Sequence, residues 1–374
     1  MAVEDKRLAF GSMLGFYKSF FHGFTMVLFG IYFTKINISL VPYALLYTIG
    51  DGVSFFLKPL VGILSDRIGE RYLLLLALIL SSVSAFLVSF TTNILYLALL
   101  EVLLAVSLAT FLTVVIIFSL RPITQKPEKK VSVFGGVSGL GWVLGLLLPG
   151  IFVDILGLKG TFYFLFIIGI VISITYLFFM NEFKFELREK SYPSIDTLKK
   201  VLDPLVYKTF DIAVFSAFLI FFVRFAIGKL GMSGSVVSLI VAFESLVFGF
   251  SEIIIGRYAK IESKRMWIKW GALIHITGIL FLVLSGNIIL YFLASGLIGL
   301  AGAFIDVWCY SFLCEKIDVS KRGTIFSTFS LSQDLSTIAG SSLPAIASSI
   351  AINPFASMFL FPFIILIYSI KRDK

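Results

Sequence analysis

Charged residues are scarce in this sequence. Only 14% of its 374 residues are Asp, Glu, Lys or Arg, whereas 59% are hydrophobic and the mean hydropathy is +1.02. Soluble domains carry a charge on about one residue in four. The low charge content therefore excludes a soluble globular protein and indicates an integral membrane protein.

Cysteine and histidine are also rare, which limits the chemistry that the chain offers. Cys309 and Cys314 are five positions apart in one apolar run, so they point in different directions and indicate neither a disulfide nor a metal site. The two histidines belong to no H-E-x-x-H motif, and neither G-x-S-x-G nor the nucleotide-binding G-x-x-x-x-G-K-[ST] occurs. We therefore expect no enzyme activity, no metal, no cofactor and no nucleotide-driven pump.

Long apolar runs make up most of the chain. A helix needs roughly 20 apolar residues to cross a hydrocarbon core of about 30 Å, and lipid offers no partner for exposed backbone groups. The sequence contains twelve such runs, at residues 8–33, 40–61, 72–90, 93–118, 133–153, 160–180, 209–228, 234–256, 266–285, 288–314, 323–349 and 352–370. The predicted fold class is an all-α integral membrane protein with twelve transmembrane helices.

The distribution of charge predicts the topology. The polar segment 181–208 contains two prolines and is interpreted as a linker between two six-helix bundles, residues 1–180 and 209–374. All but five of the 31 basic residues lie on the side that carries this linker and both termini. Because cytoplasmic loops are enriched in Lys and Arg, we expect both termini in the cytoplasm and a multi-pass location in the cell membrane. The net charge of +9 reflects this asymmetry, so we expect no nucleic-acid partner.

The chain repeats itself at a spacing of about 195 residues. The segment NILYLALL at residue 93 matches NIILYFLA at residue 287, and residues 62–71 have a degenerate counterpart at 256–265. Two halves in the same orientation imply a pseudo-two-fold axis along the membrane normal, an arrangement found in secondary transporters.

The segment GILSDRIGERY concentrates charge between two apolar runs. It resembles the signature G-x-x-x-D-R-x-G-R-R of the major facilitator superfamily, because Gly62, Asp66, Arg67, Gly69 and Arg71 match that pattern. Glu70 departs from it, since the family usually has a basic residue there. The alternative interpretation is a merely solvated loop on the positive side.

The resemblance implies further properties of this segment. In the family, the glycines of the motif permit a tight turn, and its Asp engages the other half near the start of helix 11. That helix begins here with KRGTIFS, whose free backbone amides are suitable donors to Asp66.

Two other segments match the motifs of the family less well. Helix 4 has Glu101 where the family carries an Arg, which reverses the charge. Helix 5 resembles a glycine-rich antiporter motif but ends with Pro149-Gly150, and close packing of small residues explains its glycines equally well.

Ionisable residues inside the membrane mark candidate functional positions, because each costs at least about 2.5 kcal/mol at the centre of a helix. Helices 1, 4, 7 and 10 line the central cavity in the superfamily, and each carries polar or small residues at steps of three and four, which lie on one face. The predicted substrate and proton cavity contains Lys18, His22, Asp51, Glu101, Arg224, Asp306 and Trp308. The alternatives are structural ion pairs, snorkelling to the interface and, for Trp308, packing in a core. For His275 we expect packing.

These features predict a secondary active transporter that moves a small organic solute by alternating access. We expect a monomer in the lipid bilayer, driven by an ion gradient, with H+ binding at Glu101 or at Asp51. Arg224 with Glu101, and Lys18 with Asp306, are hypothetical gate pairs between the halves. The charge of the substrate and the choice between uptake and export stay open, and a non-transporting receptor or scaffold is the alternative from another class.

Overall fold

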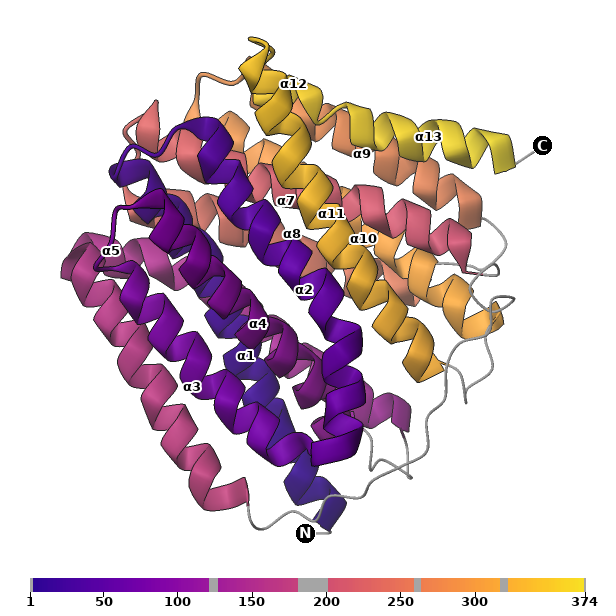
Figure 1. Ribbon diagram of the computed structural model, residues 1–374. Coiled ribbons are helices and arrows are strands. Elements are labelled where there is room, and N and C mark those ends of the chain that lie inside the picture. Colours follow the sequence, from indigo (N-terminus) through magenta and orange to yellow (C-terminus); the bar gives the residue numbers. More distant parts are fainter. Residues whose placement is uncertain (1–2, 121–126, 181–200, 259–263, 317–321, 373–374) are drawn as a thin grey trace. The chain divides into compact units, whose positions relative to one another are not determined.

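The computed structural model describes residues 3–120, 127–180, 201–258, 264–316 and 322–372, and the regular secondary structure of these residues is helical (Figure 1). The first half contains α1 (Val3–Lys35), α2 (Leu40–Ile68), α3 (Glu70–Val88), α4 (Ile94–Leu120) and α5 (Pro127–Phe179). The second half contains α7 (Leu202–Gly228), α8 (Gly234–Tyr258), α9 (Lys264–Leu284), α10 (Ile288–Lys316), α11 (Arg322–Ser349), α12 (Pro354–Ser357) and α13 (Leu360–Arg372).

Within the described residues, nine of these helical segments are long and apolar enough to cross a membrane. The other long helices, α1 and α11, cover the predicted runs 8–33 and 323–349. Each is interrupted by polar residues, such as Lys18 in α1 and Asp334 in α11, which lower its apolar character. The abundance of apolar helices confirms the prediction of an all-α multi-pass membrane protein.

The predicted runs 133–153 and 160–180 lie in two helices that share the label α5 and meet at a kink at Gly157, which has φ 71° and ψ 171°. One detail of the helices differs from the predicted runs. The helix α7 begins at Leu202, so residues 202–208 are its first two turns and not part of a linker. An acidic residue and a proline in the first turn, Asp203 and Pro204, are typical of a helix start.

The chain divides into two compact units. The N-terminal unit comprises residues 1–38, 49–189 and 227–238, and the C-terminal unit comprises residues 39–48, 190–226 and 239–374. The start of α2 thus belongs to the C-terminal unit, and the turn between α7 and α8 belongs to the N-terminal unit.

Glycines allow α1 and α5 to approach closely in the N-terminal unit. A Cβ atom on Gly141 would clash with the backbone carbonyl of Phe16, and one on Gly145 would clash with that of Phe20. By contrast, a Cβ atom on Gly139 would meet nothing within 4 Å. Packing therefore accounts for the two glycines that face α1, which agrees with the packing interpretation of this motif.

The substitution Gly141→Ala is expected to lower the free energy of unfolding by about 1–3 kcal/mol, because the added methyl group forces α1 and α5 apart. Gly139→Ala is the matched control, since it adds the same group to the same helix in open space. The control is expected to change stability by less than about 1 kcal/mol, with a gain in helix propensity as the main effect. Reversible unfolding of the purified protein measures both, and equal losses would contradict this account of the helix contact.

The C-terminal unit has a hydrophobic core between α7, α9, α10 and α13. Trp308 is part of this core, with only 6% of its surface exposed, and its ring meets that of Tyr207 edge-on at 5.3 Å and stacks on Phe312 at 5.1 Å. Trp308 therefore packs in this core, which is the alternative interpretation of this residue, and its place in a substrate cavity stays a prediction.

Candidate functional site

The turn between α2 and α3 contains the charged motif. Gly69 has φ 83° and precedes the first residue of α3, so it adopts a conformation that favours glycine and permits the abrupt turn. Gly62 lies inside α2 and takes no part in the turn. Arg67 is exposed, and the backbone carbonyl of Arg71 accepts a hydrogen bond from the Tyr176 hydroxyl at 3.1 Å. The side chain of Asp66 and the side chains at the start of α11 lie outside the described part of the structure, so their contact stays a prediction.

Glu70 has a basic partner that explains its departure from the family pattern. Its carboxylate is 4% exposed and forms an ion pair with the Arg7 guanidinium of α1 at 3.0 Å. Arg7 also donates through Nε to the carbonyl of Phe118 at 2.9 Å, and its guanidinium lies 4.7 Å from the centroid of the Phe118 ring. The acid at position 70 thus ties α3 to α1 and to the end of α4.

Three basic groups of the N-terminal unit lie within electrostatic range of one another. Lys18 and His22 are one turn apart on α1, and both are partly buried. The His22 ring lies edge-on to that of Trp142 on α5 at 5.4 Å. Lys58 of α2 is buried, and its charge acts on both Lys18 and His22.

Two acidic groups form a second cluster in the same unit. Glu101 of α4 is 6% exposed, and its Oε1 atom is buried without a hydrogen-bond partner among the described residues. Its other oxygen lies beside Gly50, where a Cβ atom would come within 3.7 Å of it. The charge of Asp51, the next residue of α2, acts on Glu101. Glu101 and Asp51 are thus brought together, as two carboxyls on neighbouring helices.

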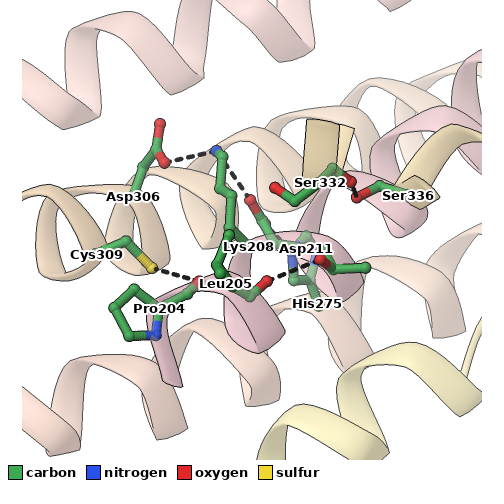
Figure 2. Close-up of polar contacts among 10 residues, drawn as sticks. Pro204, Leu205, Lys208, Asp211, His275, Asp306, Cys309, Ser332 and Ser336 are labelled. Carbon is green, nitrogen blue, oxygen red and sulfur yellow. Dashed lines mark hydrogen bonds and ion pairs between the residues drawn. The ribbon is translucent and has the colours of Figure 1, made fainter. Parts of the chain in front are cut away.

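A buried lysine organises the polar interior of the C-terminal unit. Lys208 of α7 pairs with Asp211 one turn further along at 3.4 Å and with Asp306 of α10 at 2.5 Å (Figure 2). The backbone of α10 comes near because Gly302 lies against Asp211 and Phe248. All three charged side chains are at most 7% exposed.

His275 extends this network to α9. Its Nε2 atom lies 2.9 Å from Oδ1 of Asp211, whereas its Nδ1 atom is buried without a hydrogen-bond partner in the described part of the chain. His275 is buried, as the expectation of packing implied, and it also bonds to a charged network. Sequence reasoning also missed Lys208 and Asp211. Asp211 already lay inside the predicted run 209–228, and the helix-start signal at residues 203–204 would have placed Lys208 in the same helix.

The two hypothetical gate pairs have different outcomes in the structure. Asp306 was paired with Lys18 in that hypothesis, but the structure gives Asp306 a partner in its own unit, Lys208. The Arg224 guanidinium of α7 lies 5.0 Å from the centroid of the Tyr43 ring, within the range of a cation–π contact. The Tyr43 hydroxyl is held by donation to the carbonyl of Ile220 at 2.8 Å. A gate between Arg224 and Glu101 stays a prediction.

Comparison with known proteins identifies the family. The family model described as Major Facilitator Superfamily matches residues 8–341. The chain belongs to the major facilitator superfamily. It is therefore a multi-pass membrane transporter of a small molecule and not an enzyme. Comparison with curated proteins gives no match.

Solved structures of other transporters share the superfamily fold. One is a bacterial homologue of the human lysosomal transporter Spinster in an inward-facing and occupied conformation, with a TM-score of 0.80 and 14% identity, over 99% of this chain and 96% of that chain. Another is the nucleoside transporter NupG, with a TM-score of 0.74 and 12% identity, over 99% of this chain and 98% of that chain. At such low identities the likeness concerns the fold alone.

Proposed function

We propose that this member of the superfamily is a secondary active transporter of a small organic solute, coupled to protons at Glu101. The observation that carries the proposal is the buried carboxyl of Glu101, whose Oε1 atom has no hydrogen-bond partner among the described residues and which lies near Asp51. Alternating access by two pseudo-symmetric halves is the mechanism that we assign to it.

The physical basis of the proposal is the unfavourable free energy of a charged carboxylate at the buried position of Glu101. A carboxylate is stabilised by hydrogen bonds and by cations, and it is destabilised by burial and by a second carboxylate nearby. Glu101 has the two unfavourable features, so it takes up a proton when the site is closed and releases it when water or a substrate reaches it. Asp51 is the alternative proton carrier, because it lies beside Glu101.

The driving force is sufficient for accumulation. One proton that moves down a potential of 100 mV releases about 2.3 kcal/mol, which supports roughly a 50-fold concentration ratio of the solute. One proton carried by a titratable carboxyl in the transport path can therefore drive uphill transport of the solute.

Glu101→Gln is expected to abolish accumulation of the substrate under a pH difference while exchange of labelled substrate across the membrane continues. A thermal-shift screen of small solutes on the purified protein first supplies the substrate, and uptake into reconstituted vesicles then measures both activities. Glu101→Asp is the matched control, since it keeps a titratable carboxyl, and it is expected to retain accumulation.

The two activities separate the possible roles of Glu101. Wild-type accumulation by Glu101→Gln would refute proton coupling at this residue. If Glu101→Gln lost both exchange and accumulation, Glu101 would be assigned to substrate binding instead. Absence of any uptake by the wild-type protein, despite a thermal shift, would favour the receptor alternative.

We further propose that both termini and residues 181–201, the predicted linker without its part in α7, are cytoplasmic, from the asymmetry of Lys and Arg. In a background without Cys309 and Cys314, a membrane-impermeant thiol reagent is expected to label Lys159→Cys in intact cells and to leave Lys190→Cys unlabelled. Permeabilised cells, in which both positions react, provide the control. The reverse pattern would invert the topology.

A further inference from the structure

We infer that the C-terminal unit contains a second proton-binding site, with the proton on Asp306 in the cluster of Lys208, Asp211, His275 and Asp306. This site lies outside the pair of Glu101 and Asp51, and it does not depend on their proposed role. Its components come from α7, α9 and α10, and Figure 2 shows the polar contacts among them.

The charges of the cluster do not cancel without an additional proton. One cation, Lys208, contacts two carboxylates, Asp211 and Asp306, and all three side chains are buried. If His275 is neutral, the cluster has a net charge of minus one in surroundings of low dielectric constant. An uncompensated buried charge is strongly unfavourable. One bound proton removes it.

The hydrogen bonds indicate which group holds this proton. Asp211 is compensated at both oxygens, because Oδ2 faces Lys208 at 3.4 Å and Oδ1 faces the His275 ring at 2.9 Å. Among the described residues, the charged partner of Asp306 is Lys208, which pairs with Oδ1 without good hydrogen-bond geometry. Its other oxygen points away from the labelled side chains in Figure 2. The less compensated carboxyl, Asp306, is the one that takes up the proton.

Neighbouring residues on α8 add negative charge to the cluster. Two acidic residues of α8 act electrostatically on the cluster, and the Phe248 ring of that helix lies 5.7 Å from Nζ of Lys208. On α10 the thiol of Cys309 donates to the carbonyl of Pro204, and Tyr310 lies within electrostatic range of Asp306. The titratable neighbours are Glu244, Glu252, Cys309 and Tyr310. The negative charges of Glu244 and Glu252 favour protonation of the cluster.

A metal ion is a less suitable ligand than a proton. Within the described residues, no three side chains of His, Cys, Asp or Glu are placed to hold a metal ion. Lys208 also occupies the space between the two carboxylates, where a cation would bind (Figure 2).

Binding of the proton changes the link between two helices. A proton from the aqueous side forms an O–H bond at Asp306 and converts the carboxylate to a neutral acid. Lys208 then pairs with Asp211 alone, which lies on the same helix, so the ion pair between α7 and α10 is lost. The proton therefore controls whether these helices are tied together by charge.

Infrared difference spectra of the reconstituted protein between about pH 4 and about pH 9 test the site, because a protonated carboxyl has a C=O band that a carboxylate lacks. Asp306→Asn is expected to remove one such band and to leave the band of Glu101 in place. Glu101→Gln is expected to remove the band of Glu101 and to leave the band of Asp306 in place. Unchanged acid bands in Asp306→Asn would overturn the inference, whatever the result for Glu101. Bands that change when Na+ replaces choline would show a metal-cation site instead.

A second measurement keeps the cluster intact. The chain has only two histidines, so ¹⁵N-imidazole labelling of a His22→Gln protein reports His275 alone. Its signals are expected to shift over the same pH interval as the Asp306 band. When Asp306 is protonated, Lys208 pairs with Asp211 alone and reduces the negative charge on the Asp211 carboxylate that bonds to His275. Signals that do not change with pH would contradict the proposal. A shift as large as that of imidazolium formation would place the proton on His275 and refute the assignment to Asp306.

Discussion

Lys208→Met is expected to lower the free energy of unfolding by about 3–5 kcal/mol. The substitution keeps much of the side-chain volume but removes the cation that faces Asp211 and Asp306 in the buried interior of the C-terminal unit. At a pH above the one at which Asp306 releases its proton, two carboxylates then remain without compensation, apart from the bond of Asp211 to His275. Reversible unfolding of the purified protein in detergent measures the loss.

Two matched variants separate the charge effect from other causes. Lys208→Met/Asp306→Asn removes both members of one ion pair and is expected to recover part of the loss at a pH where Asp306 is ionised, because replacement of a whole buried pair is often close to neutral. Asp211 keeps its charge and its bond to His275, so the recovery is incomplete. Lys159→Met, at an exposed position, is expected to change stability by less than about 0.5 kcal/mol. The loss in Lys208→Met should shrink at acid pH, since the uncompensated carboxyls then become protonated and neutral. A loss that is equal in the single and double variants would argue against the ion pair as its cause.

Glu70→Arg, which introduces the basic residue usual in the family, is expected to destabilise this protein by at least about 3–5 kcal/mol. Glu70 is 4% exposed and pairs with Arg7 at 3.0 Å, so the substitution breaks a buried pair and places two guanidinium groups side by side. A residue that matches the family pattern better is therefore expected to destabilise this chain. Unfolding of the purified variant and its expression level in the membrane provide the measurement.

The charge-swapped double variant Arg7→Glu/Glu70→Arg is the decisive control. It restores an opposite pair and is expected to recover part of the loss. Recovery is incomplete because Arg7 also donates to the Phe118 carbonyl and lies over the Phe118 ring. A charge reversal at the exposed Lys159 should have little effect. If the double variant is no more stable than Glu70→Arg, electrostatic pairing does not explain Glu70.

The superfamily and the membrane fold could be predicted from the sequence, because both depend on patterns that lie close together along the chain. Apolar runs of helical length determine where membrane helices form, since lipid forbids any other state of the backbone. The turn at Gly69 was predictable for the same reason, as the motif and the backbone conformation involve adjacent residues. Even the start of α7 carried a local signal in Asp203 and Pro204.

The partners of the membrane-embedded charges were decided only by the tertiary structure. Glu70 and Arg7 are 63 residues apart, and His275 and Asp211 are 64 residues apart, so each pair forms only when distant helices pack. Helical periodicity gives the depth and the face of a residue in the membrane, but it contains no information on which helix lies opposite that face. This is why Asp306 could be placed on a polar stripe from its sequence spacing, whereas its pairing with Lys208 required the packing of α7 against α10.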